Sequence, residues 1–173
     1  MGKGLPRSLS RGNPLKQEVM RQTFVVDDAA LTVDGATGVG FGSLVIGDLP
    51  AGNILLLGAV SYMQFTGPTA AGLTDTWEGD YGVGSTPASD GTITNGDVDI
   101  IPSTAIAAAT SEASPRTRGA STTSLNGAIL DNTDGSLELN LNLLIDDASI
   151  SADDIVMTVN GELILLYAVL GDD

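Results

Sequence analysis

The chain has 173 residues, with no cysteine, no histidine and only seven aromatic residues. A chain of this length can bury the core of one domain. Because cysteine is absent, a disulfide framework and thiolate metal sites are excluded. Because histidine is absent, Ser-His-Asp and Cys-His nucleophile systems and imidazole metal ligation are excluded. The formal net charge of −15 disfavours binding to nucleic acid or to an anionic membrane.

The charge is distributed unevenly along the chain. Residues 1–21 contain one acid and five basic residues, a net charge of +4; these five are Lys3, Arg7, Arg11, Lys16 and Arg21. Residues 22–173 contain 21 acids and two basic residues, Arg116 and Arg118, a net charge of −19. Glycine and proline interrupt residues 1–22, so we interpret this stretch as an extended basic N-terminal arm and residues 23–173 as one acidic domain. The arm lacks the apolar stretch of an export signal, so we expect synthesis in the cytoplasm.

The first half of the domain contains several short strand patterns. We predict strands at Thr23–Asp27, Ala30–Val33, Val39–Ile46, Ile54–Thr66, Asp75–Ser85 and Val98–Ile101. The glycines of the third strand indicate a bulge or a close approach of backbones. Residues 103–110 are rich in alanine and begin with possible capping residues, which predicts one short helix. A polar loop is expected over residues 112–124.

The second half contains the clearest strand signal. In Ser136–Asp146, leucine and isoleucine occupy one parity, whereas Glu138, Asn140 and Asn142 occupy the other. This alternation predicts a strand with one buried face and one solvent-exposed face. Ile155–Leu170 is apolar on both parities, so we expect both of its faces to be covered, in the core or at a subunit interface.

Six Asp-Gly or Asn-Gly pairs are spread over the chain, at 34–35, 90–91, 95–96, 126–127, 134–135 and 160–161. Such pairs are typical of tight hairpin turns between antiparallel strands. Together with the strand patterns, they predict an all-β fold, namely an antiparallel β-sandwich with jelly-roll-like connections.

The residues available for chemistry point away from catalysis. The only lysines lie in the arm, and no phosphate-binding glycine motif occurs. Carboxylate pairs remain possible, but 22 acids make any such pair unspecific. We therefore predict no enzyme activity, no cofactor and no metal site.

Four clusters have competing interpretations. Residues 131–136 could offer oxygen ligands to Ca²⁺, but they are typical of a polar hairpin turn. Asp146 and Asp147 with Asp153 and Asp154 are typical of a solvated loop. Trp77 and Tyr81 share one face of a strand and favour the core over a sugar-binding platform. Arg116 and Arg118 fit either surface ion pairs with the surplus acids or a contact with another subunit or a capsid.

Five segments together resemble a known group of proteins. They are GFGSLVIGDLPAGNILLLGAV (40–60), DTWEGDYGVG (75–84), DIIPSTAI (99–106), SPRTRG (114–119) and ILDNTDGSLELNLNLLIDD (129–147). Over roughly residues 40–170, the chain looks like the small all-β decoration, or cement, proteins of marine tailed bacteriophages. The resemblance implies a non-enzymatic homo-oligomer, expected as a trimer, that binds the major capsid protein and reinforces the outside of the shell. The seven basic residues are then candidate capsid or subunit contacts.

The resemblance also implies a location on the virion surface, without nucleic-acid or membrane contacts. The alternatives are another virion component, such as a shell, tail or fibre protein, a secreted carbohydrate-binding β module, or a carboxylate hydrolase. For the arm, the basic charge and five apolar residues favour attachment of the acidic body to a capsid or to a neighbouring subunit.

Overall fold

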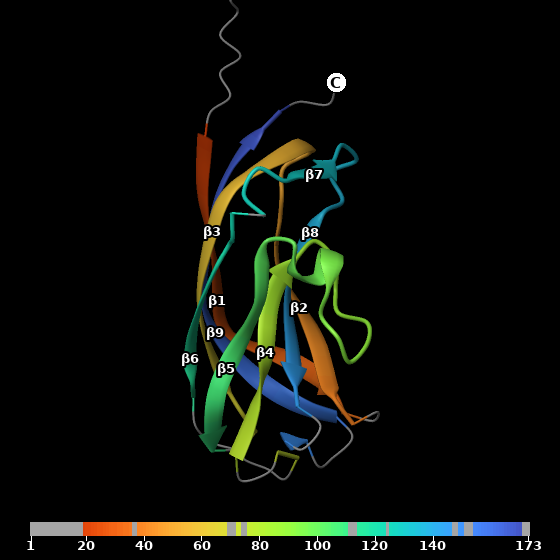
Figure 1. Cartoon of the computed structure of the whole chain (residues 1–173), viewed down its shortest axis with the longest axis vertical. Coiled ribbons are helices and arrows are strands. Elements are labelled where there is room, and N and C mark those ends of the chain that lie inside the picture. The colour runs from red at the N-terminus through yellow and green to blue at the C-terminus, as the bar shows by residue number, and fades with distance from the viewer. Residues whose placement is uncertain are drawn as a thin grey trace, which may run out of the picture.

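The computed structural model describes residues 19–35, 38–68, 72–73, 76–110, 114–123, 125–146, 149–150 and 154–170. These residues form nine strands and one short 3₁₀ helix (Figure 1). In chain order they are β1 (Val19–Asp34), β2 (Gly40–Asp48), β3 (Gly52–Thr66), β4 (Thr76–Gly84), η1 (Asn95–Val98), β5 (Ile101–Thr110), β6 (Arg116–Ala120), β7 (Ile129–Asn132), β8 (Glu138–Ile145) and β9 (Asp154–Val169). The predicted all-β fold is confirmed.

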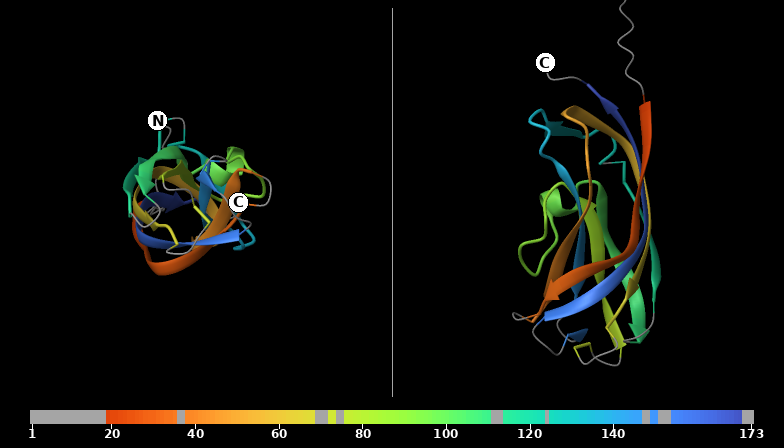
Figure 2. Two further views of the ribbon diagram at one scale, coloured as in Figure 1. Left: turned by 90° about the horizontal axis from the view of Figure 1, so that it is seen from below. Right: turned by 180° about the vertical axis from the view of Figure 1, so that it is seen from behind.

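The strands pair antiparallel in the order β5-β4-β8-β2-β1-β9-β3-β6, and β7 pairs with β3. The sheet is almost divided in two, since β1 and β2 pair only at Asp34 and Phe41. We call β5-β4-β8-β2 the β8 half and β1-β9-β3-β6 the β9 half. Both halves curl around one core (Figure 2). Most successive strands alternate between the halves, which is the connectivity of a jelly roll.

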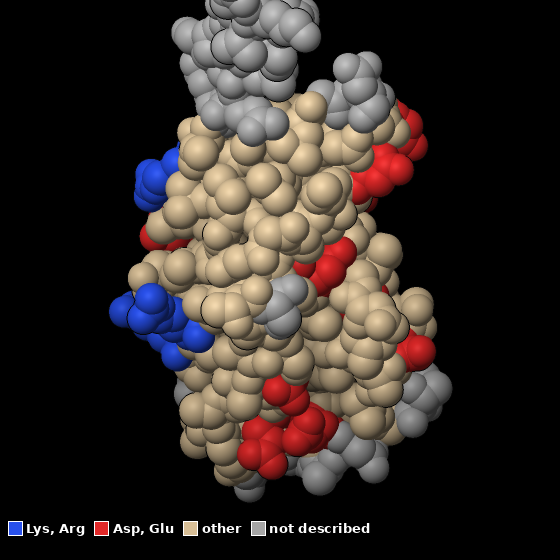
Figure 3. Space-filling model, turned by 45° about the horizontal axis from the view of Figure 1, so that its top comes forward, with Lys and Arg blue, Asp and Glu red and all other residues tan. Residues whose placement is uncertain are grey.

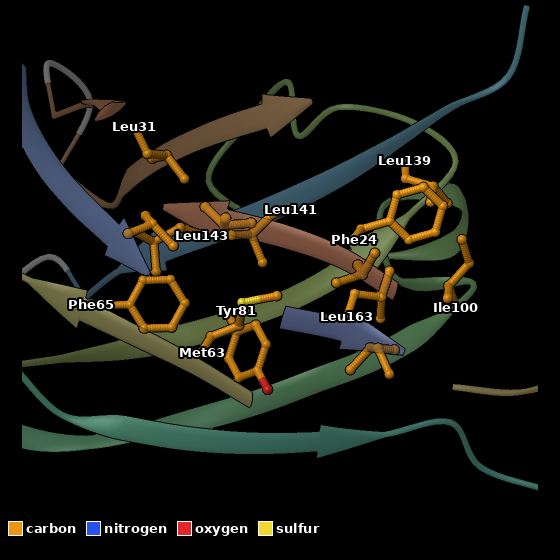
Figure 4. Close-up of a cluster of buried hydrophobic side chains, with 14 of the residues drawn as sticks. Phe24, Leu31, Met63, Phe65, Tyr81, Ile100, Leu139, Leu141, Leu143 and Leu163 are labelled. Atoms are coloured by element: carbon orange, nitrogen blue, oxygen red, sulfur yellow. The ribbon is translucent and has the colours of Figure 1, made fainter. Parts of the chain in front are cut away.

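The core lies between the two halves and is mainly aliphatic (Figure 4). One parity of β8 and one of β9 fill it with Leu139, Leu141, Leu143, Ile145, Met157, Val159, Leu163 and Leu165, all fully buried. Each buried leucine or isoleucine contributes about 1.5–3 kcal/mol. β8 and β9 are interior strands of their halves, which places both near the centre of the fold.

The two outer edges of the sheet, β5 and β6, approach each other without forming a ladder. At this seam the hydroxyl groups of Ser61 on β3 and Tyr81 on β4 form a hydrogen bond of 2.9 Å across the core. Gly119 of β6 lies against them, and a Cβ there would be 2.6 Å from Ile101 Cγ2 and 2.7 Å from Tyr81 Oη. The seam therefore depends on a residue without a side chain at position 119.

The helix predicted over residues 103–110 is wrong, because this segment belongs to β5. It pairs with β4, with Ile106 opposite Gly79, and Ile106 is buried in the core. The helix preference of alanine is below about 1 kcal/mol per residue, so strand pairing and core burial outweigh it. Pro102 does not end a strand but lies within β5, which tolerates it as an edge strand.

Two further local predictions are corrected by the pairing of β1 with β9. The two short strands expected near the N-terminus are one strand, β1, with a bulge between Val26 and Ala29. Asn160 and Gly161, expected to form a turn, lie inside β9 opposite this bulge. The Asp28 N–H donates to Asn160 Oδ1 at 2.8 Å, and Asn160 Nδ2 donates to Asp28 Oδ1 at 2.9 Å. This Asn-Gly pair therefore holds a bulge instead of forming a hairpin.

Smaller differences concern segment boundaries. Residues 95–98 form η1, so the strand predicted from Val98 begins only at Ile101, and β6 occupies part of the loop predicted over residues 112–124. β1 begins at Val19, so residues 19–22 of the predicted arm pair with β9, whereas residues 1–18 lie outside the described residues. Within the described part of the chain, no helix has the length and apolar character needed to cross a membrane.

The chain covers part of the outer face of the β8 half, at Asn142, with its own β4–β5 connection. Asn140 and Asn142, predicted to face solvent, are both buried. Asn142 Nδ2 donates to the carbonyl oxygens of Thr86 at 2.9 Å and Asp97 at 2.7 Å, and Asn142 Oδ1 accepts from the Ala88 N–H at 2.8 Å. The prediction of a solvent-exposed face at these two positions is therefore wrong. Backbone that crosses over β8 satisfies the buried amide of Asn142, whereas Asn140 is bonded to the Ser43 hydroxyl group and to the Glu138 carbonyl oxygen.

Candidate docking face

The outer face of the β9 half stays exposed and carries large apolar side chains. Val25 of β1, Tyr62 of β3 and Leu166 of β9 expose 70%, 46% and 40% of their surface. They point away from the core, since Phe24, Met63 and Leu165 beside them are buried. We call this outer surface of β1, β9, β3 and β6 the docking face.

Strand pairing places side chains of the docking face in rows that cross all four strands. One row consists of Val25, Glu162, Tyr62 and Arg118, which are direct neighbours in the β1–β9, β9–β3 and β3–β6 ladders. The next row contains Thr23, Ile164, Val60 and Ala120. Neighbouring side chains in such a row lie about 5 Å apart. The face therefore combines an apolar surface with one acidic and one basic side chain on either side of Tyr62.

A shallow hollow of about 510 Å³ lies on this face, between β6, β3 and β9. Its lining includes Val25, Tyr62, Glu162, Arg116 and Arg118. The Arg118 guanidinium lies 5.6 Å from the centre of the Tyr62 ring, in a cation–π contact. Arg116 Nε donates to Gln64 Oε1 at 3.3 Å. These contacts orient both arginine side chains on the outer face.

Three of the seven predicted contact residues lie on described strands of the β9 half. Arg116 and Arg118 lie two apart on β6, and Arg21 lies on β1, at the opposite edge of the same half. All three are exposed. Basic patches lie on one flank of the molecule with an acidic patch between them, and further acidic side chains are scattered over the visible surface (Figure 3). Lys3, Arg7, Arg11 and Lys16 lie outside the described residues.

Among the described residues, Arg116 and Arg118 form no surface ion pairs with the surplus acids, which were one interpretation of these arginines. Among the described residues, neither Arg118 nor Glu162 has an ion-pair partner. Tyr62 stands between them in the row, and strands two apart are separated by about 10 Å. Both charges are therefore available to a partner.

Two roles were predicted for β9, one in the core and one at a subunit interface. Its odd-numbered residues from Ile155 to Tyr167 are buried apart from Gly161, so the predicted core role is confirmed. Its even-numbered residues include Val156 and Leu166, which are exposed. The interface role expected for this strand therefore remains a prediction, and it falls on the docking face.

The aromatic pair Trp77 and Tyr81 belongs to the core. Both side chains are fully buried, and the Tyr81 ring packs against Phe65 with centroids 5.3 Å apart. Burial raises the pKa of the Tyr81 hydroxyl, although its hydrogen bond to Ser61 opposes this. The core role is confirmed, and these rings offer no platform for a sugar.

The acidic turn at residues 131–136 uses its carboxylates internally. Asp131 Oδ1 accepts from the Thr133 N–H and hydroxyl group, and Asp134 Oδ1 accepts from those of Ser136. The hydrogen bonds from the Ser136 hydroxyl group and N–H lower the pKa of Asp134. The turn is polar, as favoured from the sequence, but the predicted hairpin is wrong, because the turn joins β7 to β8 and these strands pair with β3 and with β2 and β4, not with each other.

Among the described residues, no group of three or more histidine, cysteine or acidic side chains is arranged to hold a metal ion. Asp146 and Asp154 are exposed, and Asp147 and Asp153 lie outside the described residues.

The carboxylate of Asp99, in the β4–β5 connection, is partly buried. The Ser85 N–H donates to Asp99 Oδ1 at 2.9 Å, and the Ser85 hydroxyl group donates to Asp99 Oδ2 at 2.6 Å. Burial raises the pKa of Asp99, although the two hydrogen bonds from Ser85 oppose this. The carboxylate closes the connection at the end of β4 and thus has a structural role.

Sequence reasoning identified the arginines of the docking face but missed Val25, Tyr62 and Glu162. The available signal was the alternation of β3, in which Val60, Tyr62 and Gln64 share the parity opposite to Met63 and Phe65. That parity could not be assigned to solvent before the neighbours of β3 were known. Comparison of the chain with protein-family models, curated proteins and solved structures finds no match.

Proposed function

We propose that the chain is a non-enzymatic structural protein of a virus particle, which decorates and stabilises the outside of a tailed-phage capsid. Its partners are the major capsid protein and further copies of itself, assembled as a homo-oligomer, for which we expect a trimer. The observation that carries the proposal is the docking face, an exposed apolar and arginine-bearing sheet surface on an otherwise acidic jelly roll.

Three features support a structural role over catalysis or sugar binding. Asp99, Asp131 and Asp134 are engaged in hydrogen bonds that shape loops. The aromatic residues that could have formed a sugar-binding platform lie in the core. The hollow on the docking face contains one carboxylate, Glu162, whereas hydrolysis of a glycoside by the common mechanism needs two.

The net charge of −19 on residues 22–173 keeps the body away from nucleic acid and supports solubility before assembly. The basic residues that precede β1 in the sequence have the opposite sign. β1 itself begins at one end of the molecule (Figure 1). We assign capsid attachment to Lys3, Arg7, Arg11 and Lys16, because an acidic surface on the shell would attract them.

The test is quantitative binding to particles. Purified full-length protein is added to expanded, undecorated tailed-phage capsids and co-sedimented at physiological salt. Saturable binding of hundreds of copies per particle is expected. A handful of copies would indicate a tail component, and no binding together with clear hits on a glycan array would refute the proposal in favour of a carbohydrate-binding module.

The role of the arm is tested by replacing Lys3, Arg7, Arg11 and Lys16 with glutamine in the full chain. Binding to particles is expected to weaken by at least about tenfold, because several weak charge contacts on one oligomer multiply. Raising the salt concentration should also weaken the binding of the unmodified protein to particles, because salt screens these charge contacts. Unchanged binding of the variant would show that the body carries the capsid contact.

A further inference from the structure

We propose that the docking face binds a second copy of this chain, with Arg118 of one copy paired with Glu162 of the partner subunit. The inference deepens the proposed function, on which its biological setting rests, by naming the self-association surface and its central charge pair. Three observations support it. The described part of the chain leaves the docking face uncovered, Glu162 and Arg118 flank Tyr62 in one row of that face, and the rest of the body is strongly acidic.

The two outer faces of the jelly roll differ in how far the chain itself covers them. The β4–β5 connection is bonded to Asn142 and buries the outer side of β8 at this residue. No described segment does the same for β9, where Leu166 and the neighbouring Val25 and Tyr62 remain exposed. An apolar sheet face of this kind marks a contact with another molecule. Tyrosine and arginine, both present here, are enriched at the centres of protein interfaces.

The order of Glu162, Tyr62 and Arg118 across the docking face favours a second copy of the same chain as the partner. Glu162 and Arg118 flank Tyr62, and neither has an ion-pair partner within the described part of its own chain. In a two-fold arrangement with its axis over Tyr62 and parallel to β3, Arg118 of each copy faces Glu162 of the partner subunit. Each contact then occurs twice, as expected for an isologous interface. In a cyclic trimer the same pair forms once at each interface.

Charge also restricts which face can self-associate. Residues 22–173 have a net charge of −19, so most contacts between two copies would bring carboxylates together. Arg116 and Arg118 supply all the basic residues of that stretch, and both line the hollow in which Glu162 is the only acid. The hollow therefore combines two basic side chains with one acidic side chain, which reduces like-charge repulsion between two copies at this part of the docking face.

The test uses the purified full-length chain alone, measured by sedimentation velocity over a range of concentrations at physiological salt. The unmodified protein is expected to form a dimer or trimer. Arg118→Glu and Glu162→Arg are each expected to weaken association by at least about tenfold, since either change places like charges opposite each other. The double variant Arg118→Glu with Glu162→Arg restores the pair and should recover association to within a few-fold.

The single variants separate pairing from net charge. Arg118→Glu makes each copy more negative, whereas Glu162→Arg makes it less negative. If only overall repulsion mattered, the second change would strengthen association, whereas pairing predicts that both changes weaken it. A double variant that stays as weak as the single variants would overturn the inference and indicate a different protein as the partner of this face.

A matched pair of valine variants locates the contact. Val25→Asp on the docking face should abolish association, whereas Val45→Asp on β2, 49% exposed on the other half, should leave it unchanged. Circular dichroism and urea unfolding establish that each variant is folded. A monomer at every concentration, or equal effects of both valine variants, would overturn the inference. Particle binding is measured separately, so the inference and the capsid binding of the proposed function can each fail without the other.

Discussion

Replacing Asn142 with alanine removes the side chain that holds the β4–β5 connection over β8. The native side chain is fully buried and makes three hydrogen bonds of 2.7–2.9 Å, to the backbone of Thr86, Ala88 and Asp97. At a net contribution of about 1 kcal/mol each, their loss should lower the free energy of unfolding by about 3 kcal/mol. This is a large fraction of the stability of about 5–15 kcal/mol typical of a domain.

The measurement is equilibrium unfolding in urea, followed by circular dichroism. With a slope of about 2 kcal/mol per M, the expected loss lowers the unfolding midpoint by about 1.5 M. Asn140→Ala is the control, because Asn140 is also buried on β8 but makes side-chain hydrogen bonds of only 3.4 Å, with Ser43 and with the Glu138 carbonyl oxygen. A midpoint for Asn142→Ala equal to that of Asn140→Ala would refute the argument that Asn142 holds the connection.

Two further predictions concern the seam and the pH dependence of stability. Gly119→Ala should lower the free energy of unfolding by about 1–3 kcal/mol, because its Cβ would lie within 2.8 Å of atoms of Ile101, Tyr81 and Ser61. Gly58→Ala is the control and should have little effect, because its Cβ would have no neighbour closer than 3.9 Å. Equal losses of stability in the two variants would contradict the reasoning. The pKa of Asp99 is raised in the folded state, so its contribution to stability is present at low pH and is lost as pH rises through the folded pKa. The stability of Asp99→Asn relative to the unmodified protein should therefore increase with pH in urea titrations from pH 3 to pH 7, and a decrease would show that the hydrogen bonds from Ser85 outweigh burial.

Much of the fold could be predicted from the sequence where the signal is local and periodic. The alternation in β8 assigns Leu139, Leu141 and Leu143 to the core without knowledge of any neighbour, because successive side chains of a strand point to opposite faces. The glycines of β2 correctly indicated a close approach: a Cβ at Gly42 would lie 2.1 Å from the Thr32 carbonyl oxygen, and a bulge lies between Val45 and Gly47.

The predictions failed where a distant segment decided the outcome. The alanine-rich stretch of β5 is a strand because β4 offers it backbone partners and the core accepts Ile106. Asn160 and Gly161 stay inside β9 because the bulge in β1, far away in sequence, takes up the side-chain hydrogen bonds of Asn160. In both cases a local preference of about 1 kcal/mol or less competes with tertiary contacts of larger total free energy.

The sequence by itself determined the all-β class, the core parity of β8 and the presence of two arginines on an acidic body. Only the tertiary structure decided that Asn142 is buried, and that Arg118, Tyr62 and Glu162 form one row across three strands. The period of a strand tells which residues share a face, but it carries no information about what lies on that face. That depends on which strands pair and on which loop crosses over them, and these are properties of the folded chain as a whole.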